Sequence, residues 1–231
     1  RGWVEEPHVE TLVEAWRRTD AAWGQRPNWM HVGLSREMLL GPLVPDLTRI
    51  SAEDRSYYRS VLDDHHEAIK GFGYWMPREK DERRRDYVIR ELYNTTTLPE
   101  LQETAETLRE AAEKADERSA ECLTTQAEYI ELAWLYQRML RNWYEAGREL
   151  APGDDPHPER SLEDIVQDEI EATEAMIRLL DGRADRFMRL YPSENMGHEF
   201  GGRILDHLKS RILLMKAHRK DAPKAVNQGR L

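Results

Sequence analysis

The stretch that decides the fold is LPELQETAETLREAAEKADERSAECLTTQAEYIELAWLYQRMLRNWYEA, residues 98–146, in which no glycine or proline follows Pro99. One continuous helix over this stretch would be roughly 70 Å long, because an α-helix rises about 1.5 Å per residue. The first part is rich in charge and has only a narrow apolar stripe, formed by Leu101, Leu108, Ala112 and Ala115. We expect this first part to extend toward solvent or another domain.

The second part of the stretch carries apolar side chains on two faces of the helix. One face has Ile130, Ala133, Trp134, Leu140 and Tyr144, and the other has Leu132, Leu135, Met139 and Trp143. A helix that is apolar on two faces is normally buried among others. We therefore expect residues 129–144 to form the central helix of a bundle.

Helical spacing of apolar residues recurs along the rest of the chain, and no alternating strand pattern of useful length is present. The spacing predicts further helices over residues 8–23, 51–70, 78–93, 162–180 and 203–218. The sequence thus predicts an all-α protein, an irregular bundle of about five to six helices with one long central helix.

Hydroxyl side chains mark where several of these helices begin. Ser51 with Asp54, and Thr97 with Glu100, have the spacing of a capping box, and Ser161 precedes the helix after a proline-rich loop.

Three segments are expected along the chain. Residues 1–50 hold the N-terminal helix and a Pro/Gly-rich aromatic loop, residues 51–222 the helical bundle, and residues 223–231 a loose tail.

Composition excludes several classes of protein. Among 231 residues, 34 are Lys or Arg and 44 are Asp or Glu, and the net charge of −10 argues against a nucleic-acid partner. No apolar run is long enough for a membrane span, so no membrane partner is expected. We expect the single cysteine, Cys122, to be a packed thiol. One cysteine excludes a disulfide framework within the chain and is compatible with a reducing compartment. Because the chain begins with Arg1, we expect it to be a piece of a longer or processed protein.

A metal site is suggested by the acidic string DDHHE, residues 63–67. Its candidate ligands are Asp63, Asp64, His66 and Glu67, because carboxylates one turn apart on a helix share a face and offer hard oxygen ligands. The pattern resembles the magnesium-binding DDxxE of class I terpene synthases, although no second metal motif follows it. The simpler interpretation is a solvated acidic helix face, and on this interpretation no cofactor is expected.

Catalytic nucleophiles have little support in the sequence. No G-x-S-x-G elbow or phosphate-binding glycine loop is present. Arg211 and His218, seven residues apart, imitate the Arg/His pair of helical ribonucleases, but such a pair is expected by chance and the acidic balance opposes RNA binding.

Four aromatic residues lie in or beside the predicted loops: Trp23, Trp29, Tyr74 and Trp75. A flat apolar ring with a polar edge suits stacking on a sugar or packing against another domain. The same rings could instead plug the ends of the bundle, and the sequence leaves both interpretations open.

The turn GPLVPDL, residues 41–47, followed by SAEDRSYYR, residues 51–59, resembles a pattern in large bacterial proteins of glycoside-hydrolase type. The stretch GRILDHLK, residues 202–209, is similar to the last helix of the same region. In that family a catalytic barrel is followed by a helical C-terminal region. Gly41 stands where the pattern often has arginine. The resemblance implies that the catalytic carboxylates lie in a barrel outside this chain, against which this helical domain packs.

Three functions follow as hypotheses. The leading one is a helical accessory domain of a carbohydrate-active enzyme, with a structural or cleft-lining role and carbohydrate as ligand. The second is a self-contained, metal-dependent helical enzyme that uses the acidic motif at residues 63–67. The third is a helical module for protein interaction or dimerisation, formed by the long charged helix.

Overall fold

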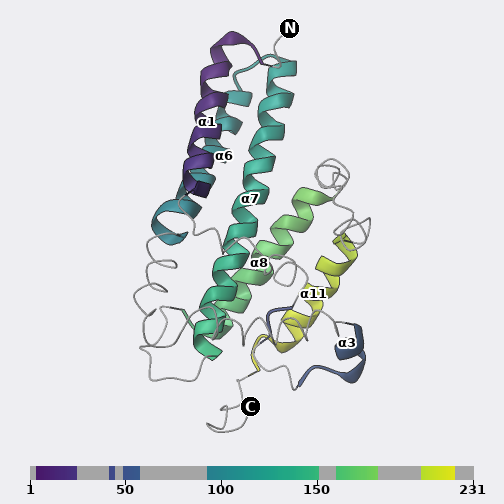
Figure 1. The fold of residues 1–231 in the computed structure, drawn as a ribbon. Coiled ribbons are helices and arrows are strands. Elements are labelled where there is room, and N and C mark those ends of the chain that lie inside the picture. The colour runs from purple at the N-terminus through teal and green to yellow at the C-terminus, as the bar shows by residue number, and fades with distance from the viewer. Residues whose placement is uncertain are drawn as a thin grey trace, which may run out of the picture. The chain divides into compact units, whose positions relative to one another are not determined.

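The computed structural model describes residues 4–24, 42–44, 49–57, 93–150, 160–181 and 204–221 (Figure 1). These ranges hold six helices and no strand: α1 (Glu6–Gly24), α3 (Ala52–Tyr57), α6 (Leu98–Ala112), α7 (Glu117–Leu150), α8 (Leu162–Leu180) and α11 (Ile204–His218). The predicted all-α class is confirmed, and α7 is the long helix, with 34 residues.

Helices α1, α8 and α11 match the predicted helices 8–23, 162–180 and 203–218 to within two residues at each end. Helix α3 begins directly after Ser51, as predicted. The rest of the predicted helix 51–70, and all but the final residue of the predicted helix 78–93, lie outside the described residues. None of the described helices is long and apolar enough to cross a membrane.

The chain divides into two compact units. Unit 1 comprises Arg1–Met30 and Asp86–Arg138, and unit 2 comprises His31–Arg85 and Met139–Leu231. Helix α7 contributes its first part to unit 1 and its last part to unit 2. The segment boundaries expected at residues 50 and 222 stay predictions.

Unit 1 has a core in which α1, α6 and the first part of α7 pack together (Figure 1). Ala15 and Ala22 are small enough to let α1 approach α6, whose Leu101 and Leu108 are fully buried. Helix α7 adds Leu123, Ala127 and Ile130 to the same cluster. The charged part of the deciding stretch, expected to extend toward solvent or another domain, packs with its narrow apolar stripe in the core of unit 1.

The deciding stretch is also not one helix, because it turns back at residues 113–116 without glycine or proline. Asp116 caps the new helix: its Oδ1 accepts the backbone N–H of Ser119 at 2.8 Å, and its Oδ2 accepts the Ser119 hydroxyl at 2.9 Å. The turn brings α7 back beside α6, and Arg109 on α6 forms an ion pair with Glu131 on α7. An aspartate followed three residues later by serine was the overlooked signal for a helix start.

The capping box predicted at Thr97 and Glu100 is wrong. Thr97 has helical dihedral angles, φ −65° and ψ −50°, and makes no side-chain cap, because a π-helical turn over residues 93–97 leads directly into α6. A capping side chain needs an extended backbone to reach back to the first free N–H groups. The Thr97 hydroxyl instead donates to the backbone carbonyl of Ala22 at 3.5 Å.

The two serine caps are confirmed. Ser161 is extended, with φ −65° and ψ 157°, and its hydroxyl oxygen accepts the N–H of Asp164 at 3.1 Å. Ser51 likewise accepts the N–H of Asp54 at 3.0 Å. Each hydroxyl also donates to the aspartate carboxylate at 2.6 Å. Both serines therefore fix the direction in which their helix begins.

In unit 2, α8 and α11 pack against each other. The predicted core positions Ile165, Ile170 and Leu180 on α8, and Leu208, Ile212 and Met215 on α11, are buried. Ile177 and Leu205 are half-buried. Leu213, by contrast, turns outward and is 70 % exposed.

Candidate functional site

Two features of the described structure merit consideration as functional sites. One is a network of charged side chains inside unit 2, and the other is a surface on α1 in unit 1. The network is a candidate because a buried charge is costly and often marks chemistry.

The centre of the network is the ion pair between Arg211 on α11 and Glu169 on α8, both of which have no exposed surface. Arg211 Nη1 also donates to the Thr173 hydroxyl at 3.0 Å. Asn142 on α7 donates from Nδ2 to Glu169 Oε2 at 2.9 Å. The carboxylate of Glu169 thus has a hydrogen-bond donor on each oxygen.

Burial raises the pKa of Glu169, whereas the charge of Arg211 and the hydrogen bond from Asn142 act in the opposite direction. Desolvation is the larger influence, because removing a carboxylate from water disfavours its ionised form.

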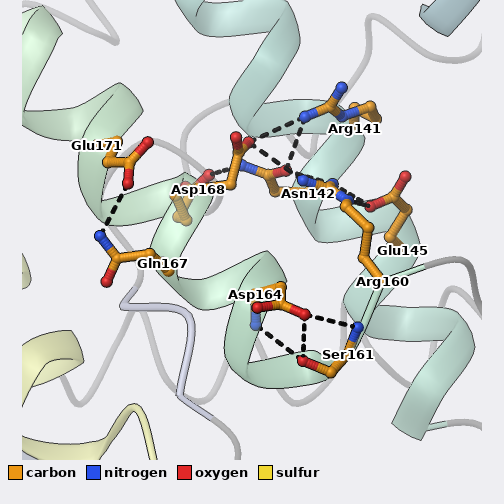
Figure 2. Close-up of polar contacts among 10 residues, drawn as sticks. Arg141, Asn142, Glu145, Arg160, Ser161, Asp164, Gln167, Asp168 and Glu171 are labelled. Carbon is orange, nitrogen blue, oxygen red and sulfur yellow. Dashed lines mark hydrogen bonds and ion pairs between the residues drawn. The ribbon is translucent and has the colours of Figure 1, made fainter.

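The network continues from Asn142 toward the start of α8, and Figure 2 shows this part. Arg160 Nη2 donates to Asn142 Oδ1 at 2.9 Å, and Arg160 Nε donates to Glu145 Oε2 at 2.8 Å. Arg141 Nη2 donates to Asp168 Oδ2 at 2.9 Å. Arg160 Nη1 lies 3.5 Å from the same oxygen of Asp168.

Charge balance decides what this network can do. Three guanidinium groups, those of Arg141, Arg160 and Arg211, meet three carboxylates, those of Glu145, Asp168 and Glu169. Each carboxylate already has a cationic partner, and the central pair has no contact with solvent. The network therefore joins α7, α8 and α11 in one arrangement.

The second feature is the surface of α1. Its buried positions Ala15, Thr19 and Ala22 face the core of unit 1. Val9, Val13 and Trp16 follow one another at intervals of four and three residues, so they lie on one face of the helix. Their exposed fractions are 44 %, 39 % and 44 %. We call this face, defined by Val9, Val13 and Trp16, the α1 stripe.

Charged side chains flank the α1 stripe. Arg17 Nη1 lies 3.6 Å from Glu14 and 3.9 Å from Glu10 on the same helix. Arg18 turns toward α6, where its Nε lies 2.9 Å from Glu100 and its Nη2 lies 2.9 Å from Glu103. These two carboxylates raise the pKa of Arg18 through their hydrogen bonds, Glu103 more than Glu100. Arg18 thus holds α1 against α6.

A groove of about 420 Å³ runs between α1 and α6 beside these charges. It is lined by Glu10, Thr11, Glu14, Ala15, Arg18, Thr104 and Thr107. The Thr104 and Thr107 hydroxyls donate to backbone carbonyls on their own helix, those of Glu100 and Glu103. Two exposed carboxylates, Glu10 and Glu14, make the outer rim of the groove acidic.

The site residues predicted from the sequence fall outside these features. The predicted metal ligands Asp63, Asp64, His66 and Glu67 lie outside the described residues, as do Trp29, Tyr74 and Trp75. Trp23 belongs to α1, but its side chain is outside the description as well. The predicted metal site and the predicted aromatic ligand contacts stay predictions.

Among the residues that the structure describes, no group of three or more His, Cys, Asp or Glu side chains is arranged to hold a metal ion. Cys122 is half-buried and packs against the core of unit 1, as expected for a packed thiol.

Sequence reasoning missed the network. It placed Val13 and Trp16 on one apolar face of the first helix but did not predict that this face is exposed. Arg211 was considered as half of an Arg/His pair, whereas its partner is Glu169, 42 residues earlier. The signal in the sequence is an arginine at a core position, since it stands between Leu208 and Met215 on the apolar face of α11. The signal for the α1 stripe is that α1 has more apolar residues than one face can bury.

The chain matches no protein-family model, no curated protein and no solved structure. The resemblance to the helical region of glycoside-hydrolase-type proteins therefore stays a prediction from the sequence.

Proposed function

We propose that this chain is a helical protein-interaction module and that the α1 stripe receives a helical segment of a partner protein. The observation that carries the proposal is the exposure of Val9, Val13 and Trp16 on one face of a well-packed helix. A row of half-exposed apolar side chains at helical spacing is the usual recognition pattern for a second helix.

The rigidity of α1 supports this role. Its opposite face is fixed by Ala15 and Ala22 in the core, and Arg18 is held by two carboxylates of α6. At the start of the helix, the backbone N–H of Glu5 donates to the hydroxyl of Ser119 at 3.0 Å. A preorganised surface loses little conformational entropy when a partner binds.

The sequence suggests that such a module interacts through the long charged helix, whose first part is now α6. The apolar stripe of that segment lies in the core of unit 1, where Leu101 and Leu108 are fully buried. The α1 stripe has the exposed apolar surface that such an interaction requires, with Trp16 as its largest side chain.

The test is selection of binders from a displayed library of amphipathic helical peptides on the immobilised full chain. Affinities of the selected peptides are then measured for Val13→Gln and Trp16→Gln. Leu213→Gln is the matched control, because Leu213 is an exposed apolar residue of unit 2. Glutamine keeps the helix propensity high, and exposed substitutions change stability little.

We expect peptides that bind the unmodified chain and the Leu213→Gln chain equally, and that bind the two α1 variants at least about tenfold more weakly. Peptides that bind all chains alike, or a library that yields no binder, would contradict the proposal.

A further inference from the structure

We infer that the partner helix at the α1 stripe is basic, with apolar residues at helical spacing and Lys or Arg along its flanks. This inference rests on the proposed function and names the chemistry of the partner.

Three carboxylates lie beside the α1 stripe. Glu6 precedes Val9 by three residues, Glu10 precedes Val13 by three, and Asp20 follows Trp16 by four. Residues three and four apart are neighbours on a helix surface. All three acidic side chains are exposed, so they lie where a docked helix would present its own flanks. Arg17, four residues after Val13, also flanks the stripe and lies 3.9 Å from Glu10, so three carboxylates stand against one guanidinium there.

The surrounding surface is also negatively charged. Helix α1 has four carboxylates and two guanidinium groups, and α6 has four carboxylates and one guanidinium group. All three arginines, Arg17, Arg18 and Arg109, already lie in ion pairs with carboxylates of unit 1. The two helices therefore keep an excess of negative charge that a basic partner would balance.

The same charges disfavour the other occupants. Antiparallel pairing of two copies of α1 centred on Val13 would bring Glu6 of one copy beside Asp20 of the other, so like charges would meet. Nucleic acids and anionic membrane surfaces carry the same sign as this face and would be repelled.

The test uses three synthetic peptides that share one apolar face of leucines and differ at the flanking positions, which are lysine, glutamine or glutamate. Fluorescence anisotropy of labelled peptides measures their affinity for the full chain at low and high salt. A triple variant, Glu6→Gln with Glu10→Gln and Asp20→Asn, removes the carboxylates beside the α1 stripe. Its control, Glu163→Gln with Asp181→Asn and Asp206→Asn, removes three exposed carboxylates of unit 2 and changes the net charge by the same amount.

We expect the lysine peptide to bind about tenfold more tightly than the glutamine peptide at low salt, and the advantage to shrink at high salt. The triple variant on α1 should remove most of this advantage, whereas the control should keep it.

Equal binding of the lysine and glutamine peptides, each weakened by Val13→Gln, would overturn the basic partner and leave the proposed function standing. If the chain self-associates in sedimentation experiments and Val13→Gln abolishes this, the partner is a second copy of the chain. That result would also overturn the basic partner and leave the proposed function standing. If Val13→Gln weakens the binding of none of the three peptides, the proposed function is overturned.

Discussion

Arg211 illustrates how a single residue ties three helices together. Its guanidinium is buried without exposed surface and meets Glu169, which in turn accepts a hydrogen bond from Asn142 on α7. Two buried charges lose their hydration, and their mutual attraction compensates only when the remaining polar atoms are also bonded. Here Thr173 and Asn142 supply those bonds, so the pair specifies which faces of α7, α8 and α11 meet.

Loss of Arg211 should change both the stability of the chain and the pKa of Glu169. Replacing Arg211 with methionine should lower the free energy of unfolding by about 3–5 kcal/mol at neutral pH, because Glu169 is left buried without its cation. Glu169 can then take up a proton. Its pKa in the folded chain, already raised by burial, rises further once Arg211 no longer opposes the shift. The folded state then binds more protons than the unfolded state above pH 4.5, the ordinary value for this group.

Stability of Arg211→Met should therefore fall as the pH rises from about 4.5 through the folded-state pKa of Glu169. The measurement is urea unfolding at a series of pH values. The control is the double variant Arg211→Met with Glu169→Gln, which has no charge at either position and should lack this pH dependence. Identical pH profiles for the single and double variants would show that Glu169 stays ionised without Arg211.

The turn between α6 and α7 shows how one capping residue divides an element. Asp116 accepts the N–H and the hydroxyl of Ser119, and the same hydroxyl oxygen accepts the N–H of Glu5. The hydrogen bond from the Ser119 amide is the largest cause of the lowered pKa of Asp116. A lowered pKa means that the ionised side chain stabilises the fold.

Asp116→Asn tests this turn. The stabilisation by ionised Asp116 is present above about pH 3.8, its ordinary value, and is lost as the pH falls through the lower pKa of the folded state. The unmodified chain should therefore exceed the variant in stability at neutral pH, and the difference should shrink below pH 3.8. Urea unfolding followed by circular dichroism measures it, and a difference that does not change with pH would contradict this role.

The sequence predicts a helix well when the residues that determine its limits lie within the helix or next to it. The limits of α1, α8 and α11 were predicted because apolar spacing and the Ser161 cap are contained in the segment itself. The break at residues 113–116 was missed because it contains no glycine or proline. Thr97 failed as a cap because a preceding π-helical turn holds its backbone in a helical conformation.

The candidate sites were harder to predict, because they depend on what is left after packing. Arg211 and Glu169 are 42 residues apart, and no local pattern joins them. The α1 stripe becomes visible only when the core is known to use Ala15, Thr19 and Ala22 and to leave Val9, Val13 and Trp16 outside.

The whole chain forms two compact units, and helix α7 contributes to both. Leu108 is fully buried in the cluster of unit 1. Leu108→Ala should lower the stability of unit 1 by about 2–5 kcal/mol, since the surrounding helices relax only partly around a cavity.

Native-state hydrogen exchange measures which helices lose stability in Leu108→Ala. Amides of α1 and α6 should exchange faster in Leu108→Ala, while those of α8 and α11 should change less, because local stability follows the packing of each unit. Equal acceleration in all four helices would show that the two cores unfold as one.

Binding of a partner helix at the α1 stripe can be measured by a single comparison. A helical peptide selected on the full chain is titrated against Val13→Gln and Leu213→Gln, two exposed apolar positions changed in the same way. We expect the affinity to fall at least about tenfold for Val13→Gln and to be unchanged for Leu213→Gln. Equal affinity for the two variants would contradict binding at the α1 stripe.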